Sequence, residues 1–182
     1  EVAALSTPEI LKRLKSQDIL LGMLYERSVA GDEYDRLPLF SERYVLVSSG
    51  QASLPHQLGW AEVAELPLCL LSRDMQNRQT LQALFEAVDA SPRVVLETND
   101  MRLLLAECQS GRAFAVVPLS ALPTRHDGAG LRTHPIVPEH AENVCLVRLR
   151  REPQPALSQV TWQIAGDLDL EAALNESLPG AS

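Results

Sequence analysis

Small polar side chains follow three expected strands, each at the point where a helix is expected to begin. They are Ser6-Thr7, the stretch from Ser72 to Gln76, and Thr98-Asn99-Asp100. In parallel α/β sheets, the loops after the carboxyl ends of the strands form the ligand crevice. Helix N-termini in such loops present free N–H groups and a partial positive charge, which suit carboxylates and similar anions. Each junction alone is explained more simply as a helix cap, but three together make an anion-binding site an equal alternative.

Motifs for catalysis or for a cofactor are absent from the sequence. There is no GxSxG elbow, Walker loop or HExxH motif. Residues 128–130 begin like a dinucleotide-binding loop, but Thr133 replaces the third glycine, so we interpret them as a surface turn. His134 and His140 are separated by two prolines, and we expect them to be exposed loop residues rather than metal ligands. Cys145 lies in an apolar run that raises the pKa of its thiol. We therefore expect no catalysis, no metal and no cofactor.

Composition and charge exclude several classes of protein. The 182 residues include 16 Lys+Arg and 24 Asp+Glu, a net charge of −8, which argues against DNA contact by this chain. Three cysteines without a CxxC pair indicate buried thiols in a reducing compartment. No apolar run reaches the roughly 18 residues that span a membrane. The first residues lack the features of a signal peptide, so we expect a cytoplasmic protein with no membrane contact.

Strands and helices are expected to alternate along the chain. Apolar spacing predicts helices from Ser6, where Glu9 completes a capping box, and over 60–64, 81–88, 101–108 and 157–168. Apolar runs predict strands over 2–5, 19–25, 43–49, 68–72, 93–97, 113–117, 131–137 and 144–149. Pro135 favours an edge position for the strand over 131–137, and residues 175–182 are expected to be frayed. The alternation predicts an α/β fold with mostly parallel sheets and helices on both faces.

Four stretches, in this order, resemble the effector-binding domain of the LysR-type transcriptional regulators. The first is LSTPEILKRL at 5–14, and the second is LPLFSERYVLV at 37–47. The third runs from 60 to 67 and continues through LCLL at 68–71 into a helix over 78–85. The fourth extends from ETN at 97–99 to GRAFAVVP at 111–118. The resemblance covers most of the chain, although each motif alone is only moderately specific.

The resemblance implies a two-lobe, periplasmic-binding-protein-like fold. Lobe I would hold residues 1–67 and 143–182, and lobe II residues 68–142. A small molecule, often an organic acid, would bind in the cleft between the lobes and change the arrangement of regulator subunits on DNA, without catalysis. The expected effector-binding residues are those at the three junctions: Ser6, Thr7, Ser72, Arg73, Gln76, Thr98 and Asn99.

The sequence departs from the family pattern in three places. Residues 19–22 replace the region of the family's Asp, and Ala113 replaces the second Gly of its GxG. Nothing matches the family's opening strand and helix or its helix-turn-helix, so the chain resembles a fragment. DNA contact would then lie in a segment absent from this chain, and the domain would pair as a dimer, or a tetramer at full length.

The alternative is a solute-binding protein of a transport system, which the missing signal peptide and the three thiols disfavour. A small α/β enzyme is disfavoured by the absent motifs.

Overall fold

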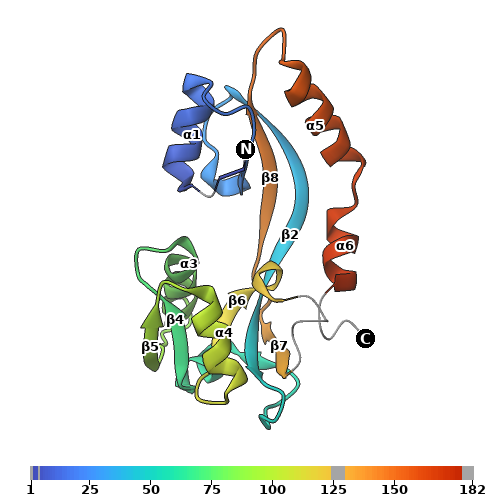
Figure 1. Ribbon diagram of the computed structural model, residues 1–182. Helices are drawn as coiled ribbons and strands as arrows, with labels where there is room; N and C mark the ends of the chain where they lie inside the picture. The colour runs from blue at the N-terminus through green and yellow to red at the C-terminus, as the bar shows by residue number, and fades with distance from the viewer. Residues whose placement is uncertain (1, 4, 124–129, 178–182) are drawn as a thin grey trace. The chain divides into compact units, whose positions relative to one another are not determined.

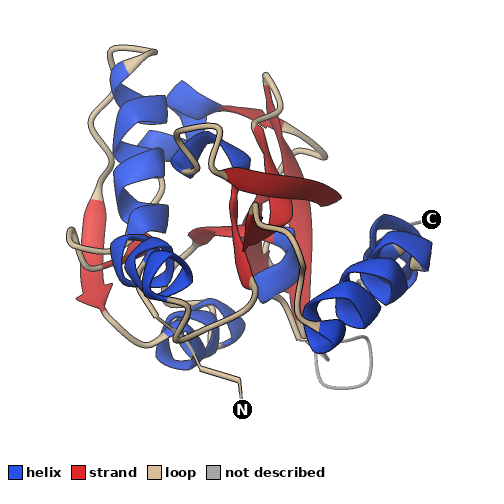
Figure 2. Cartoon of the chain, turned by 90° about the horizontal axis from the view of Figure 1, so that it is seen from above, coloured by secondary structure: helices blue, strands red, loops and turns tan. Residues whose placement is uncertain are grey.

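Helices and strands are mixed along the whole chain, as Figures 1 and 2 show for the computed structural model. The structure describes residues 2–3, 5–123 and 130–177. The helices are α1 (Thr7–Ser16), α2 (Trp60–Glu65), α3 (Gln76–Glu86), α4 (Met101–Gln109), α5 (Ala156–Asp167) and α6 (Leu170–Ser177), with 3-10 turns η1 (Glu26–Ser28) and η2 (Leu119–Ala121). The strands are β1 (Gly22–Tyr25), β2 (Tyr34–Ser49), β3 (Leu58–Gly59), β4 (Leu68–Leu71), β5 (Val94–Thr98), β6 (Ala115–Pro118), β7 (Leu131–Val137) and β8 (Ala141–Leu149). The expected α/β class is confirmed.

The chain divides into two compact units. Unit 1 holds Glu1–Glu42 and Glu142–Ala173, and unit 2 holds Arg43–Ala141 and Leu174–Ser182. Residues 43–67 therefore group with unit 2, whereas the sequence placed them in lobe I. The physical reason is strand pairing, because the second half of β2 is hydrogen-bonded to β6 and β7. The assignment of residues to functional lobes remains a prediction.

Unit 1 is a small sheet covered by α1. Strand β1 pairs antiparallel with β8, from Gly22 opposite Val147 to Tyr25 opposite Val144. Helix α1 has Pro8 in its first turn, where the missing N–H is harmless, and ends at Gln17 in the left-handed conformation. The buried core of this unit consists of Leu14, Leu24, Val29, Tyr34, Cys145 and Val147.

Unit 2 contains the paired strands β2, β3, β6 and β7 and a separate two-stranded sheet of β4 and β5, with helices packed on both sides. Successive residues of a strand point to opposite faces, and Leu46 and Val47 accordingly enter two different core clusters. On one face the cluster includes Trp60 and Val63 of α2 and Leu81 and Phe85 of α3. On the other face it includes Leu104 and Cys108 of α4. The expected covering of both sheet faces by helices is thus present in this unit.

The strand pairs of unit 2 are mixed rather than mostly parallel. Strand β2 is antiparallel to β6 and to β7, while β3 pairs parallel with β7 and β4 with β5. Strand β7 has the expected bounds but lies between β2 and β3, so its expected edge position is wrong. Pro135 is tolerated there because β3 pairs only with Ile136 and Val137, beyond the proline.

Local details at the two ends of the chain also differ from the expectations. The capping box at Ser6 does not form, because Ser6 makes no side-chain cap and Glu9 instead accepts a hydrogen bond from Arg13 at 2.7 Å. The strand expected before α1 does not form at the described residues 2, 3 and 5. Strand β1 is shorter than the expected 19–25, and β2 is longer than the expected 43–49. Residues 175–177 belong to α6 rather than to a frayed tail, and 178–182 lie outside the described residues.

The close approach of α1 to β1 yields a stability prediction. A Cβ added at Gly22 would overlap Cγ2 of Ile10, a stiff β-branched side chain. We expect Gly22→Ala to lower the free energy of unfolding by about 1–3 kcal/mol through overpacking, measured by urea denaturation.

Gly166→Ala is the matched control. Its Cβ would lie at an ordinary 3.8 Å from Leu37, and it would remove a glycine from the last turn of α5. That control is expected to raise stability by up to about 1 kcal/mol. Equal effects of the two substitutions would contradict the packing described for unit 1.

Candidate functional site

Two of the three polar junctions lie side by side in unit 2. Strands β4 and β5 are parallel, with Leu71 opposite Thr98, so their carboxyl ends share one edge. The backbone N–H of Ser72 donates to the carbonyl of Thr98 at 2.9 Å. The loops that lead into α3 and α4 therefore start from adjacent positions, which is the arrangement that forms ligand crevices in α/β sheets.

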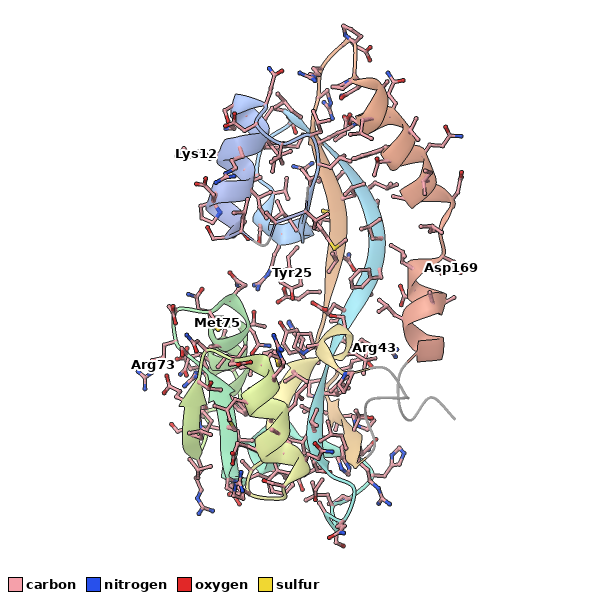
Figure 3. All side chains as sticks on the ribbon, viewed as in Figure 1. Lys12, Tyr25, Arg43, Arg73, Met75 and Asp169 are labelled. Atoms are coloured by element: carbon pink, nitrogen blue, oxygen red, sulfur yellow. The ribbon has the colours of Figure 1, made fainter. Side chains whose placement is uncertain are left out.

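The start of α3 has no side-chain cap. Its N-cap residue is Met75, which offers no side-chain acceptor, so the N–H groups of the first turn are left for solvent or a ligand. Arg73 and Gln76 are exposed and Ser72 is half-buried. Figure 3 shows the Arg73 side chain pointing outward from the loop before Met75. Arg73 is followed by the exposed carboxylate of Asp74, so what this end of α3 offers to an anion is a cation and uncapped N–H donors beside one acidic residue.

The start of α4 is capped by its own residues. Asp100 Oδ1 accepts a hydrogen bond from the N–H of Arg102 at 2.8 Å, and Thr98 Oγ1 accepts one from the N–H of Asp100 at 3.1 Å. For Thr98 the simpler interpretation as part of a helix cap is therefore correct. Its hydroxyl still has a proton to donate, and the side chain is half-buried beside Ser72. Asn99 is exposed.

Arg78 is a further residue at this edge, one that the sequence did not single out. Its side chain is 3% exposed, and its Nη1 donates to Oε1 of Gln82 at 2.8 Å. Its Nε is buried and has no partner among the described residues. Burial lowers the pKa of Arg78, while the nearby carboxylate of Glu97 opposes that shift. A buried guanidinium with an unsatisfied N–H is stabilised by any anion that reaches it.

The sequence did contain a signal for the burial of Arg78. The apolar stripe of α3 includes Leu81 and Phe85, and position 78 lies one turn before Leu81 on the same face. A charged residue at a core-facing position is rare and needs a partner. Asn77, its neighbour, also has a buried Nδ2 with no partner in the described structure.

Ser6 and Thr7 belong to unit 1. Helix α1 begins at Thr7, and the carbonyl of Ser6 accepts the first helical hydrogen bond from Ile10 at 2.9 Å. Ser6 is exposed and Thr7 half-buried. Ser72 and Thr98 lie side by side in unit 2, with Arg73 and Gln76 following Ser72 along the chain and Asn99 following Thr98. The inclusion of Ser6 and Thr7 in the same site stays a prediction.

His134 corrects the expectation of an exposed loop histidine. It lies in β7 and is 7% exposed. Its Nε2 lies 2.9 Å from Ser48 Oγ and its Nδ1 3.2 Å from the carbonyl oxygen of Pro55. Burial lowers the pKa of its imidazole. No group of three His, Cys, Asp or Glu residues able to hold a metal occurs in the part of the chain that the structure describes.

The three cysteines are buried free thiols, as expected. Burial raises the pKa of Cys69 to about 11 and that of Cys108 to about 12. Burial also raises the pKa of Cys145. Because the thiolate is the reactive form, these three side chains are poor nucleophiles at neutral pH.

Two compact α/β units, with polar side chains at the ends of parallel strands in one of them, define the class of two-lobe ligand-binding domains. The family model described as the LysR substrate binding domain matches residues 1–168. The chain therefore belongs to this family of effector-binding domains of transcriptional regulators.

Solved structures of LysR-family regulators share the fold. A mutant of OxyR from Corynebacterium glutamicum superposes with a TM-score of 0.71 at 19% identity, covering 96% of this chain and 54% of that one. HinK from Pseudomonas aeruginosa superposes with a TM-score of 0.76 at 16% identity, covering 94% and 61%. The effector-binding domain of QuiR, in complex with shikimate, gives 0.69 at 16% identity, covering 89% and 77%. This chain thus spans about half the length of the OxyR chain.

Two other comparisons are negative. A search of curated proteins gives no significant match to the sequence. Among the described residues, none of the helices has the length and apolar character needed to cross a membrane.

The buried histidine yields a prediction about pH. Because burial lowers the folded-state pKa of His134 below its ordinary 6.5, the unfolded chain binds the proton more readily. This group's contribution to stability is complete above that ordinary value and is lost as the pH falls through the folded-state pKa. We expect the free energy of unfolding to decrease on going from pH 7.5 to pH 5, and His134→Gln to reduce that decrease, measured by urea denaturation at each pH.

His140→Gln is the control for this titration. His140 is half-buried and its ring lies 5.5 Å from that of Tyr44. This substitution also removes a histidine from unit 2, so the comparison isolates the effect of losing the buried imidazole of β7. A decrease that is the same in His134→Gln and in the unsubstituted chain would show that His134 is not responsible.

Proposed function

We propose that this domain senses a small organic anion at the ends of β4 and β5. The anion would accept hydrogen bonds from the first-turn N–H groups of α3 and from the hydroxyls of Ser72 and Thr98. Arg73 and Gln76 would contact it from the exposed side, and Asn99 from the loop before α4. In the same proposal, Ser6 and Thr7 of unit 1 contribute to effector recognition.

The observation that carries this proposal is the uncapped start of α3. Of the two helix starts at this edge, that of α4 is capped by Asp100, whereas that of α3 has no side-chain cap at Met75. Arg78 lies in the first turn of α3 and is buried with Nε unpartnered. Glu97 and Asp100 lie at the same edge, so the free N–H donors, rather than a net positive charge, support the proposal. The QuiR domain, of the same fold, binds the carboxylate shikimate.

The activity of the whole protein is also part of the proposal. We propose that effector binding controls transcription without catalysis, since the effector shifts the balance between two arrangements of the regulator. The charge of −8 favours DNA contact through a segment outside this chain. A cytoplasmic homodimer, able to form tetramers at full length, fits the expectations from the family.

A ligand screen with matched variants tests the proposal. We expect small carboxylates to raise the melting temperature of the chain in a thermal-shift screen. For a carboxylate found in this way, Thr98→Val is expected to weaken binding by roughly 2- to 10-fold in isothermal titration calorimetry, the value of one hydrogen bond. Calorimetry is run well below the melting temperature, because Thr98 also contacts the N–H of Asp100.

Thr161→Val is the matched control, a half-buried threonine on α5 of unit 1. It is expected to leave the affinity unchanged. The proposal is contradicted if no carboxylate stabilises the chain, or if both threonine variants bind the carboxylate as tightly as the unsubstituted chain.

A further inference from the structure

One stretch of unit 2 is held by a single hydrogen bond. Residues 53–57 connect β2 to β3, and we call them the β2–β3 loop. Within the described part of the chain they make one hydrogen bond, in which the Pro55 carbonyl accepts from Nδ1 of His134 at 3.2 Å. Leu54 is half-buried and packs against a core cluster of the same unit. The position of this loop therefore depends on one histidine and one leucine.

The partners of His134 indicate which of its ring nitrogens carries the proton. A carbonyl oxygen can only accept, so Nδ1 must donate to Pro55. In the neutral ring Nε2 is then the acceptor, and it lies 2.9 Å from the hydroxyl of Ser48, which can donate to it. The neutral ring with its proton on Nδ1 therefore fits both of its partners.

A second proton, on Nε2, places a positive charge in a site that disfavours it. Ser48 can still accept from Nε2, because its hydroxyl can turn to the carbonyl of Ser49 at 3.1 Å. Burial has the largest effect and lowers the pKa of His134, and Arg132 of β7 and His56 of the loop lower it further. The hydrogen bond to Pro55 favours the charged ring but does not outweigh burial. Strand β2 contributes Ser48, which carries no charge.

The loop is the part of this site that moves most easily. An ionised imidazole is strongly stabilised by water, and one hydrogen bond to a carbonyl does not replace that hydration. Strand β7 is fixed by its pairing with β2 on one side and with β3 on the other. The loop has no such pairing. Water therefore reaches the charged ring more readily by displacement of the loop than by opening of the sheet.

From this geometry we propose that the contact between His134 and Pro55 is a pH-dependent latch on the β2–β3 loop. The neutral ring holds the loop against β7. A second proton on the ring releases residues 53–57 to solvent, while the strands on either side stay paired. The latch is separate from the ends of β4 and β5 and does not depend on the function proposed there.

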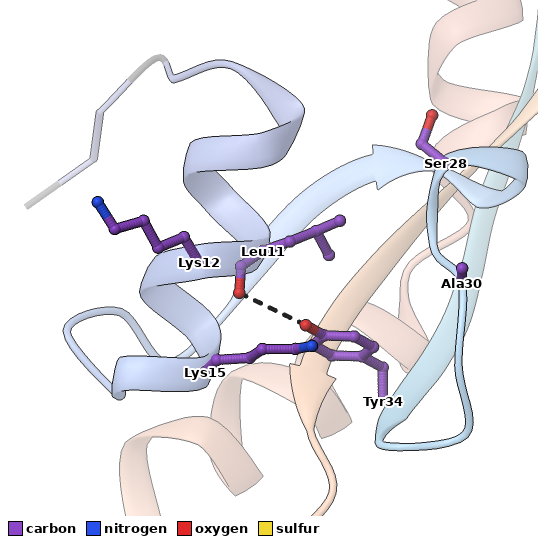
Figure 4. Close-up of a pocket in the computed structure, with 6 residues that line it drawn as sticks. All are labelled: Leu11, Lys12, Lys15, Ser28, Ala30 and Tyr34. Carbon is purple, nitrogen blue, oxygen red and sulfur yellow. Dashed lines mark hydrogen bonds between the residues drawn. The ribbon is translucent and has the colours of Figure 1, made fainter.

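The loop after η1 in unit 1 is the internal reference. Figure 4 shows this region, with Ser28 and Ala30 labelled, beside α1. Arg36 Nη2 donates to the carbonyl of Val29 at 3.0 Å and to that of Gly31 at 2.6 Å. Arginine side chains keep their charge on acidification. This loop is therefore expected to stay ordered when the β2–β3 loop is released.

An NMR titration tests the latch. Backbone order parameters of Leu54, His56 and Gln57 are measured from pH 7.5 down through the midpoint of the His134 ring signals. We expect values of about 0.85 at pH 7.5, typical of rigid backbone, and values below about 0.6 once the ring is protonated. The change should have the same pH midpoint as the His134 ring. The order parameters of the reference loop should not change.

Two variants identify the titrating group. His134→Gln can bond to Pro55 and Ser48 but cannot take up a proton, so its β2–β3 loop is expected to stay ordered at low pH. His56→Gln removes the other histidine of the site and is expected to keep the release. If His134→Gln folds poorly, the midpoints in the unsubstituted chain and in His56→Gln decide. The latch is refuted if the loop stays ordered beside a protonated His134, if His134→Gln loosens as the unsubstituted chain does, or if both loops lose order together.

Discussion

The parallel pairing of β4 with β5 is the constraint on which the candidate site depends. Its last hydrogen bond, from Ser72 N–H to the Thr98 carbonyl, brings two helix starts to one edge of the sheet. The pairing is held from both faces of the sheet. Leu70 packs into the cluster that contains Leu81 of α3, whereas Cys69 and Leu71 pack into the cluster that contains Leu104 of α4. Core packing therefore sets where each helix can begin, and the polar loops are placed as a consequence.

The two helix starts at this edge differ in a way that packing alone does not require. Asp100 caps α4 within the chain, as a helix that serves only the fold is expected to be capped. Helix α3 starts at Met75 without such a cap and contains a buried arginine with an unpartnered Nε. Leaving a buried donor unsatisfied is destabilising, and a bound anion would remove that penalty for Arg78. The asymmetry between the two helices is the physical basis for proposing that an anion binds at the start of α3.

Sequence patterns predicted the elements better than their pairing. Helical spacing located α3 and α4, and Leu131–Val137 was predicted with its observed bounds. Pairing depends on contacts distant in sequence, so the antiparallel neighbours of β2 could not be read from its apolar run. For the same reason His134 was misplaced, because only pairing with β2 brings it to Ser48. The burial of Arg78 was not predicted. Its position lies on the apolar face of α3, but a charged side chain there was not considered a buried one.

Hydrogen exchange at the start of α3 tests most directly whether an anion binds there. In the free chain, the N–H groups of Gln76, Asn77 and Arg78 lie in the first turn of a helix without a side-chain cap and are expected to exchange readily. With a saturating carboxylate from the thermal screen, we expect the exchange of these three N–H groups to slow at least about tenfold, because a bound acceptor protects them. The first-turn amides of α5, after its N-cap Pro155, serve as the internal reference and are expected to be unchanged. Anion binding at the start of α3 would be contradicted if exchange slowed equally across the whole chain. It would also be contradicted if exchange at Gln76–Arg78 did not slow with the ligand bound.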